Sequence, residues 1–269
     1  MTGAAITLDE ARKAGGGARA LEARVVARSD LSAATVDEAY ALFASVYQGT
    51  DRARFVRDLS EKQWVVLLHD RESNALGGFS TVHLQEIMTP RGPASLFFSG
   101  DTVVNPAYWG QKTLQLAVAR LLLTLKLRQP SRPVYWFLIS KGYRTYLMLA
   151  NAFPRSVPRE GEDREDELRA LLDRVATERF GESYDPATGI IHHAVPHEHV
   201  RDGIAPVSES ALRNRHVRFF VERNPHHADG DELACLALVR IRDLVRATAR
   251  FTMHRALRVL GLAGTRPRR

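Results

Sequence analysis

The sequence of 269 residues contains one cysteine, Cys235, which excludes an internal disulfide and a zinc site built from cysteines. Cys235 lies in the apolar segment 232–238, so we expect a small buried residue rather than a nucleophile. Long apolar runs are also missing, and no stretch reaches the roughly 18 residues that a membrane-spanning helix needs. Residues 1–20 lack the apolar run of a secretory signal and have the composition of a disordered tail. These absences favour a cytoplasmic protein.

The composition is that of an ordinary globular protein, with 45% hydrophobic and 26% charged residues. The length suffices for one large domain or two modest ones. The formal net charge of +7 suits an anionic partner. A phosphorylated cofactor, an acidic carrier protein, a lipid surface and a nucleic acid all meet that description.

The spacing of apolar residues predicts an α/β protein with a mixed, mostly antiparallel sheet flanked by helices. Three successive strands favour an antiparallel meander, whereas a strand–helix–strand unit requires a crossover and favours a parallel pair. Met88–Pro93, with two prolines, is expected to be a loop. The expected strands are 22–28, 63–69, 75–84, 95–104 and 134–139, and the expected helices are 35–47 (capped by Ser32 or Thr35), 52–59, 111–128 and 141–151.

The second half of the chain is expected to be a helical or irregular extension. We divide the sequence into the tail 1–20, a core 21–157 and an extension 158–269 that ends in a basic helix. Within the extension, a helix is expected from Glu165 to Phe180, and a histidine-rich strand or loop at 190–200. The pattern does not assign residues 211–221, and a last helix is expected from Asp231 to about Leu260.

The strand 95–104 is followed by a turn that leads directly into a helix. Asn105-Pro-Ala-Tyr-Trp-Gly110 breaks the strand, and Gln111, Lys112 and Thr113 occupy the first helical turn. The free backbone N–H groups at a helix N-terminus attract anions. We therefore expect an anionic group, such as a phosphate, to bind at the turn.

This layout, with Val104-Asn-Pro-Ala-Tyr-Trp-Gly-Gln111 opening the long helix, resembles the GNAT superfamily of N-acyltransferases over about residues 20–155. The resemblance implies that the turn binds the pyrophosphate of acyl-coenzyme A. It also implies that the strand before the turn splays from the next strand and that the pantetheine arm lies in the gap. The donor-binding residues expected on this basis are Val103, Val104, Gly110, Gln111, Lys112, Thr113, Lys141 and Arg144.

The phosphate turn departs from the family pattern, because Lys112 and Leu114 stand where glycines are usual. A glycine lets the backbone approach a phosphate, so Leu114 is expected to hinder that approach, while Lys112 supplies a point charge. The donor is therefore either acyl-coenzyme A or an acyl carrier protein, as in the similar acyl-homoserine-lactone and N-acyl amino acid synthases. It would act as a co-substrate, with no tightly bound cofactor. The alternative is a non-catalytic module of the same fold that binds an acyl carrier or lipid.

Transfer of an acyl group to an amine needs a base for the amine and an acid for the departing thiolate. Asp101 is the only acid in the strand 95–104 and is the candidate base; the alternative is that it binds backbone groups near Gly100. The resemblance places the acid on the helix 141–151, which offers Tyr143 and Tyr146. Tyr146 is one residue out of the family register, and its alternative role is packing against the sheet.

Two further clusters have simpler explanations. His192, His193, His197 and His199 form a metal-like series, but the turn signals around them favour a surface loop, and we expect no metal. The last helix carries Arg242, Arg246 and Arg250 at helical spacing, next to apolar residues. Through residues 240–269 it would contact an anionic membrane surface or an acidic carrier protein, or it simply packs on the core with a solvated arginine face. No motif supports nucleic-acid binding.

Overall fold

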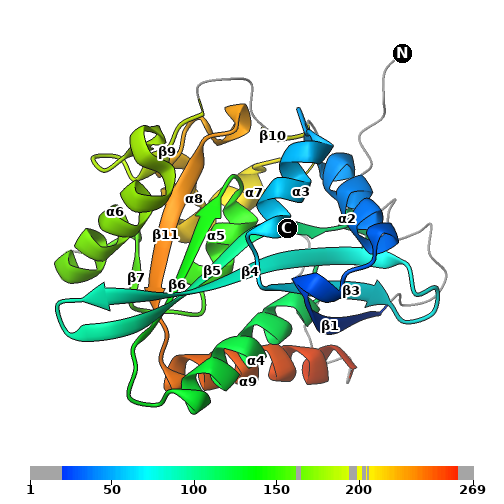
Figure 1. The fold of residues 1–269 in the computed structure, drawn as a ribbon, viewed down its shortest axis with the longest axis horizontal. Coiled ribbons are helices and arrows are strands. Elements are labelled where there is room, and N and C mark those ends of the chain that lie inside the picture. Colours follow the sequence, from blue (N-terminus) through cyan, green and yellow to red (C-terminus); the bar gives the residue numbers. More distant parts are fainter. Residues whose placement is uncertain (1–19, 162–164, 194–198, 202–203, 205, 260–269) are drawn as a thin grey trace.

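A computed structural model describes residues 20–161, 165–193, 199–201, 204 and 206–259 (Figure 1). The tail predicted for residues 1–20 therefore lies almost wholly outside the described residues. The same holds for the terminal arginines Arg266, Arg268 and Arg269. Side chains of the last helix are described up to Arg250.

A single large sheet organises the chain. Its strand order is β1-β3-β4-β5-β6-β11-β9-β8, and β7 pairs with β11. Every pair is antiparallel except β5 with β6, which is parallel, so the predicted mixed, mostly antiparallel sheet is confirmed. The strands are β1 (Leu21–Ala27), β3 (Trp64–Asp70), β4 (Leu76–Thr89), β5 (Gly92–Val104), β6 (Val134–Ser140), β7 (Ser156–Val157), β8 (Tyr184–Asp185), β9 (Ile190–Ile191) and β11 (Glu232–Leu238).

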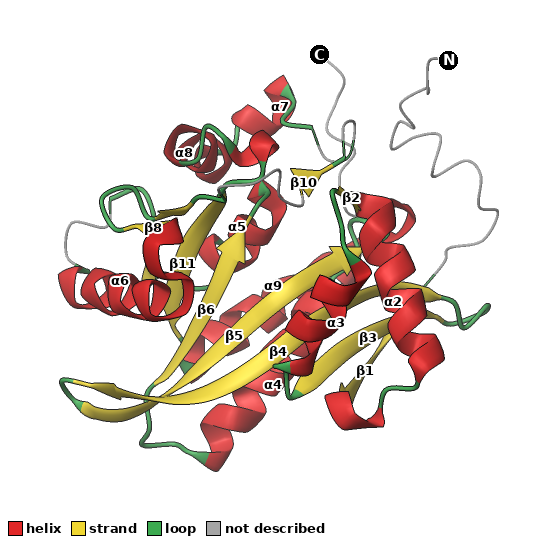
Figure 2. Ribbon diagram, turned by 45° about the horizontal axis from the view of Figure 1, so that its top comes forward, coloured by secondary structure: helices red, strands yellow, loops and turns green. Residues whose placement is uncertain are grey.

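Helices cover both faces of the sheet (Figure 2). One face carries α2 (Ala33–Val46), α3 (Arg52–Ser60) and α6 (Asp166–Phe180), and the other carries α4 (Thr113–Arg128) and α9 (Ile241–Val259), which lie side by side. The remaining helices are α5 (Tyr143–Ala150), α7 (Glu209–Leu212) and α8 (Arg215–Arg223). The short strands β2 (Tyr47–Gln48) and β10 (His199–Val200) form a separate small sheet.

The alternation of β3 shows why both faces are covered. Val65 and Leu67 pack among the residues of α2 and α3, whereas Val66 and Leu68 pack among those of α4. Successive side chains of a strand point to opposite faces, so a strand that is apolar at every position must be buried on both sides. The sheet therefore has a hydrophobic core on each of its two faces. A functional site is then expected at the ends of the strands, where the faces are not covered.

The prediction of a loop at 88–93 is wrong. β4 runs to Thr89 and β5 starts at Gly92, with Thr89 opposite Gly92 and only Pro90 and Arg91 between them. Thr89 Oγ1 closes this turn by donating to the carbonyl of Gly92 at 2.8 Å. Pro93 is tolerated within a strand because β6 starts to pair with β5 only at Ser95, so no partner on that side needs its missing N–H.

The helix expected from Asp231 is wrong over its first part. Residues 232–238 form β11, which pairs with β6 in the interior of the sheet, and the helix begins only at Ile241. Leu-Ala-Cys-Leu-Ala is apolar on every side, and periodicity alone cannot separate a buried strand from a buried helix in so short a run. Cys235 is buried there, as expected, and burial raises the pKa of its thiol. Residues 211–221, which the pattern left open, fall in α7 and α8, apart from Arg213 and Asn214 between the two helices.

Helix α9 packs against the core through Leu244 and Ala247. Arg242, Arg246 and Arg250 are exposed, as are Ile241 and Val245. This arrangement favours the alternative of a packed helix with a solvated arginine face. Among the described residues, no helix combines the length and the apolar character needed to cross a membrane.

The position of β11 can be tested with one core substitution. Leu236 on β11 is fully buried, whereas Val245 on α9 is 56% exposed. We expect Leu236→Ala to lower the free energy of unfolding by about 2–5 kcal/mol, because it leaves a cavity in the core. Val245→Ala is the control and should change it by less than about 0.5 kcal/mol. Denaturant unfolding measures both, and equal effects would contradict the assignment of residues 232–238 to a core strand.

Candidate functional site

The two central strands of the sheet separate part of the way along their length. β5 pairs with β6 from Ser95 to Ser99, opposite Val134 to Leu138. Beyond these residues β5 continues to Val104 and β6 to Ser140, with no further pairing between them among the described residues. The backbone polar groups of β5 that face β6 in this stretch lack a strand partner and are available to a ligand.

A β-bulge lies where the strands separate. Ser80 and Val82 of β4 pair with Thr102 and Ser99 of β5, so Gly100 and Asp101 together lie opposite Thr81. An additional residue of this kind bends a strand and redirects its side chains. The bulge therefore explains both the divergence of β5 from β6 and the placement of Asp101 at the gap.

A cavity of about 1100 Å³ opens at this gap. The segments that line it include the bulge and the end of β5, the turn and start of α4, the end of β6 with the start of α5, the end of α3, and the end of α6. Every donor-binding residue expected from the sequence lies in its wall: Val103, Val104, Gly110, Gln111, Lys112, Thr113, Lys141 and Arg144.

The turn before α4 is held by its own hydrogen bonds. Trp109 Nε1 donates to the carbonyl of Val104 at 2.8 Å, and Asn105 Oδ1 accepts from the N–H of Ala107 at 3.0 Å. Gly110 has a φ of +93°, a conformation that favours glycine. The N-cap residue of α4, Lys112, makes no side-chain hydrogen bond to the helix start. The first turn of α4 therefore presents backbone N–H groups at the cavity wall.

Leu114, which was expected to hinder approach to this helix start, lies in the cavity wall with most of its side chain buried. Its side chain packs in the core beside Tyr108 and Ala117 and is only 4% exposed. A side chain on a helix points along one face, and this one points into the sheet rather than over the N–H groups.

Asp101 is half-buried in the cavity wall, on the bulge. Burial raises the pKa of its carboxyl, and the nearby cations Lys62 and Lys141 act in the opposite direction. A carboxylate with a raised pKa is a better proton acceptor for an amine than an exposed one. The structure thus places Asp101, the candidate base, at the gap between β5 and β6.

Lys62 reaches the cavity across the bulge. A Cβ on Gly100 would lie 3.1 Å from Lys62 Cε and 2.7 Å from Thr81 Oγ1, so this position needs glycine for close approach. Lys62 is only 7% exposed, and burial lowers the pKa of its ammonium, while Asp101 acts to raise it. The bulge therefore makes room for a buried cation beside the candidate base.

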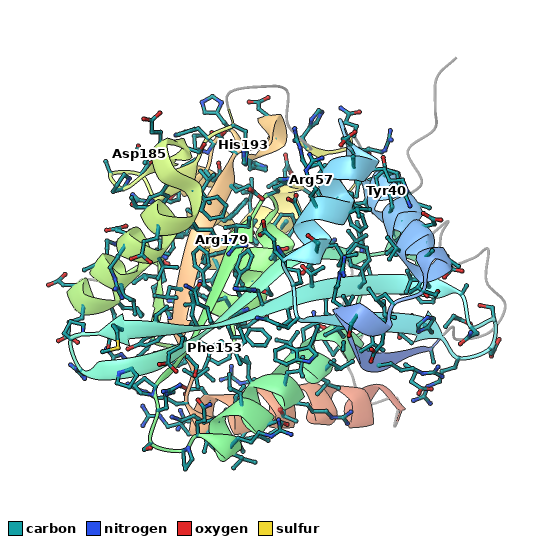
Figure 3. The ribbon with its side chains drawn as sticks, viewed as in Figure 1. Tyr40, Arg57, Phe153, Arg179, Asp185 and His193 are labelled. Atoms are coloured by element: carbon teal, nitrogen blue, oxygen red, sulfur yellow. The ribbon has the colours of Figure 1, made fainter. Side chains whose placement is uncertain are left out.

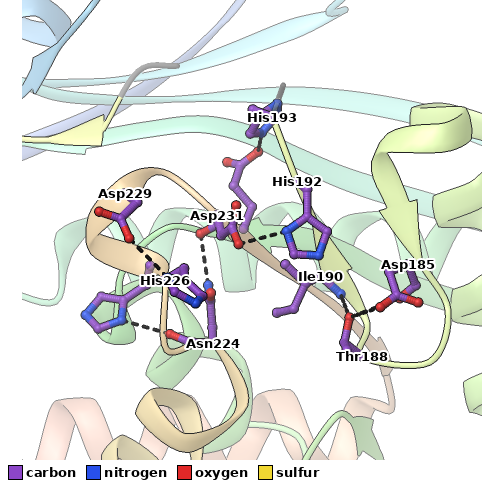
Figure 4. A network of polar contacts seen from close by, with 11 residues as sticks. Asp185, Thr188, Ile190, His192, His193, Asn224, His226, Asp229 and Asp231 are labelled. Carbon is purple, nitrogen blue, oxygen red and sulfur yellow. Dashed lines mark hydrogen bonds and ion pairs between the residues drawn. The ribbon is translucent and has the colours of Figure 1, made fainter. Parts of the chain in front are cut away.

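Lys141 and His193 share one buried carboxylate. Glu232 Oε1 lies 3.7 Å from Lys141 Nζ, and Glu232 Oε2 lies 3.0 Å from His193 Nε2. The neighbouring His192 contacts Asp231 instead, with 2.8 Å between His192 Nδ1 and Asp231 Oδ2 (Figure 4). Within the described ranges, no group of three or more His, Cys, Asp or Glu is arranged to hold a metal ion. His193 and Glu232 both line the cavity.

The two candidate tyrosines have different surroundings. Tyr143 lines the cavity, next to Arg144, whose guanidinium lies 4.3 Å from the ring centroid of Trp109. Tyr146 is fully buried, donates to the carbonyl of Pro158 at 3.2 Å and packs on Phe219 and Phe220. Burial raises the pKa of its hydroxyl. The structure brings Tyr143 together with Asp101 and favours the packing role for Tyr146.

The cavity also contains charged residues that were not part of the predicted site, among them Lys62, Arg179, His193 and Glu232. Lys62 follows α3 and Arg179 lies in the last turn of α6. The two residues reach the same strand from distant parts of the sequence, which no local pattern indicates. Glu232 was not recognised because the sequence wrongly predicted a helix, rather than strand β11, at its position. The histidine cluster did mark His193, but as a metal candidate rather than as a partner of a carboxylate.

Comparison with known proteins gives similarities at the level of structure only. No protein-family model matches the chain, and no curated protein matches its sequence. The structure is similar to a probable N-acyltransferase from Enterococcus faecalis, with 13% identity and a TM-score of 0.37, over 56% of this chain and 42% of that protein. It is also similar to YhbS, a GNAT family N-acetyltransferase from Escherichia coli in complex with CoA, with 16% identity and a TM-score of 0.36, over 59% of this chain and 76% of that one. An acyl-CoA N-acyltransferase from Pseudomonas aeruginosa is similar too, with 15% identity and a TM-score of 0.37, over 50% of this chain and 88% of that one.

The buried ammonium of Lys62 gives a testable pH dependence. Its folded-state pKa is lowered below 10.5, so the unfolded state binds the proton more tightly, and stability must rise as pH increases toward 10.5. The variant Lys62→Arg keeps its charge throughout this range and serves as the control. We expect the wild type to gain free energy of unfolding relative to Lys62→Arg as pH rises through the lowered pKa. Parallel curves for the two proteins in denaturant titrations would contradict the burial of this charge.

Proposed function

We propose that this protein is an N-acyltransferase that moves an acyl group from a pantetheine thioester to an amine. The observation that carries the proposal is the single cavity in which the bulge with Asp101, the unpaired edge of β5 and the start of α4 meet. These three parts supply a base, a slot for an extended chain and a site for a phosphate. The similar fold of known N-acyltransferases agrees with this reading but does not carry it.

The donor fits between the strands. The separated edges of β5 and β6 offer backbone N–H and C=O groups to the amides of a pantetheine arm, as another strand would. The first turn of α4 offers N–H groups to a phosphate, and Lys112 and Arg144 add positive charge at the same end of the cavity. Coenzyme A and an acyl carrier protein both carry phosphopantetheine, so both remain candidate sources of the thioester.

The reaction uses the polar groups of the cavity in a fixed order. Asp101 accepts a proton from the attacking amine, whose nitrogen then forms a bond to the thioester carbonyl carbon. The carbon–sulfur bond breaks, which yields an amide and a thiolate. Tyr143, at the start of α5, is the proposed acid that protonates the thiolate, because Tyr146 is held by Pro158 away from the cavity.

Substitution of the proposed base tests the assignment. We expect Asp101→Asn to lower kcat/KM by about 10²–10⁴-fold while the thioester still binds, because general base catalysis contributes that much. The control is Asp37→Asn, an exposed aspartate on α2 outside the cavity, which should keep the full rate. Release of free thiol from acetyl-CoA, octanoyl-CoA and octanoyl-carrier protein, with a panel of amines, measures the rate and separates the two donor sources.

The pH profile of the same assay supplies an independent readout. The pKa of Asp101 is raised above 3.8, so the wild-type rate should fall as pH drops through that raised value, and Asp101→Asn should lose this acid limb. Tyr143→Phe should slow the reaction, whereas Tyr146→Phe should affect stability only. A full rate in Asp101→Asn would overturn the base assignment, and donor binding without turnover on any amine would indicate the non-catalytic alternative.

A further inference from the structure

The ammonium group of Lys141 is held at the end of β6 by a carboxylate from a distant part of the chain. Ser140, the last residue of β6, pairs with Leu233 on β11. The antiparallel register therefore places Glu232 opposite Lys141. Glu232 Oε1 lies 3.7 Å from Lys141 Nζ, and little of either side chain is exposed, 12% for Lys141 and 8% for Glu232. Opposite charges that face each other across two strands stabilise the pair, so this contact follows from the pairing of β6 with β11.

Both oxygens of the Glu232 carboxylate are engaged. His193 Nε2 lies 3.0 Å from Glu232 Oε2, and Figure 3 shows His193 at the end of the sheet where β11 begins. The ammonium of Lys141 also lies 5.5 Å from the ring centroid of Tyr47, on β2. A lysine side chain has many rotamers in solution, and each contact removes some of them. Glu232 and Tyr47 together therefore restrict the direction in which Lys141 points.

Lys141 lies across the gap from Asp101. The pairing of β5 with β6 ends after Ser99 and Leu138. Asp101 follows Ser99 by two residues, and Lys141 follows Leu138 by three, so the two lie at about the same level on opposite edges of the gap. Both line the cavity. Burial raises the pKa of the Asp101 carboxyl, and Lys62 and then Lys141 act against it, which agrees with a position of Lys141 close to the acid.

The proposed reaction needs a positive group at one further atom. When the amine nitrogen bonds to the carbonyl carbon, an electron pair of the C=O double bond moves to the oxygen, which becomes an oxyanion. A donor already aimed at that oxygen lowers the barrier most effectively in a cavity that excludes water. The base and this donor contact different atoms of one tetrahedral centre, so they must lie on different sides of it. Asp101 and Lys141 meet this requirement when the thioester lies between the two strands.

Lys62 is the other buried lysine near Asp101, but its surroundings differ. Its Nζ lies 5.5 Å from the ring centroid of Phe98, which belongs to the paired part of β5, before the gap opens. Burial lowers the pKa of the Lys62 ammonium, and Asp101 is the charged group that acts most strongly in the opposite direction. Lys62 is therefore a partner of the base, whereas Lys141 is paired with a carboxylate of its own at the far edge of the gap.

We propose that Lys141 binds the carbonyl oxygen of the thioester and that Glu232 is the positioning residue that holds Lys141 there. Lys141 donates a hydrogen bond to the oxygen and keeps its proton throughout. The C=O double bond re-forms as the carbon–sulfur bond breaks, and the thiolate takes its proton from Tyr143. Glu232 and His193 come from the chain beyond residue 157, so that part of the sequence completes the site. This inference rests on the proposed acyl transfer.

The thiol-release assay separates positioning from general damage. We expect Lys141→Met to lower kcat/KM by about 10²–10³-fold, the usual cost of losing one oxyanion donor, with kcat falling by more than KM rises. Glu232→Gln should lower kcat/KM about tenfold or more, yet have no further effect in Lys141→Met, because Glu232 acts through Lys141. Glu232→Asp keeps the charge and should recover part of the rate. Glu38→Gln, an exposed glutamate on α2, is the control. Additive losses in the double variant would overturn the positioning role.

Chemical restoration of the ammonium group gives a second readout. Lys141→Cys can be alkylated with 2-bromoethylamine, which restores an ammonium on a side chain of nearly the same length, or with iodoacetamide, which leaves it neutral. The natural cysteine of the sequence, Cys235, is fully buried, so the reagents act at position 141. Recovery of the rate with 2-bromoethylamine alone would support the role of the charge. Equal rates after the two treatments would overturn it.

A pair of probes that differ in one carbonyl group tests the contact without turnover. One is the ketone analogue of acetyl-4′-phosphopantetheine, in which CH₂ replaces sulfur, and the other has the carbonyl reduced to CH₂ as well. In calorimetric titrations, the wild type should bind the ketone about tenfold more tightly, as expected for a charge-assisted hydrogen bond. Lys141→Met should lose this preference and Glu232→Gln should weaken it, whereas Lys126→Met, outside the cavity, should keep it.

The outcomes separate this inference from the proposed function. Equal binding of the two probes by the wild type, or an unchanged preference in Lys141→Met, would overturn the inference and leave the donor site intact. A preference that depends on Lys141 would support it even if no amine were acylated. Binding of neither probe would overturn the donor site, and the role of Lys141 with it.

Discussion

The whole site depends on one interruption of hydrogen bonding, the end of pairing between β5 and β6 after Ser99 and Leu138. The bulge at Gly100 and Asp101 causes this interruption, because the additional residue bends β5 away while its pairing with β4 continues to Val104. Strand edges are normally paired or covered, so an opening inside a sheet persists only where the surrounding structure holds it. Here β4 holds β5 on one side, and β11 holds β6 on the other.

The electrostatics of the cavity follow from the same bend. Without a side chain on Gly100, Lys62 can cross the bulge, and its ammonium comes to lie near Asp101 with little access to solvent. Burial raises the pKa of the Asp101 carboxyl and lowers the pKa of the Lys62 ammonium, so both groups become easier to neutralise. Such an arrangement costs stability in the empty protein. A ligand that brings opposite charges into the cavity would lower this cost.

Much of the fold could be predicted from the sequence, because the strands around the site alternate or are apolar throughout and the helices have clear starts. The predicted site is also largely assembled in one cavity, since Asp101, Tyr143 and the residues of the turn are local to one strand–turn–helix–strand–helix unit. What the sequence could not supply comes from long-range packing. β11 looks like a helix until its pairing with β6 is known, and Lys62 and Arg179 meet only because α3 and α6 cover the same face. The burial of the Leu114 side chain in the core likewise depends on packing between distant segments.

Hydrogen–deuterium exchange with free 4′-phosphopantetheine as the probe tests the central claim most directly, because both candidate donors carry this group. If the separated strands hold the donor, the probe should slow exchange of the backbone amides of residues 100–104 and of the first turn of α4, 113–115. Those of the β5 amides that face β6, and the amides of the helix start, are expected to exchange readily in the free protein, since they lack backbone partners there. Protection confined to other segments, or no protection at millimolar probe, would contradict the assignment of the gap between β5 and β6 as the donor site.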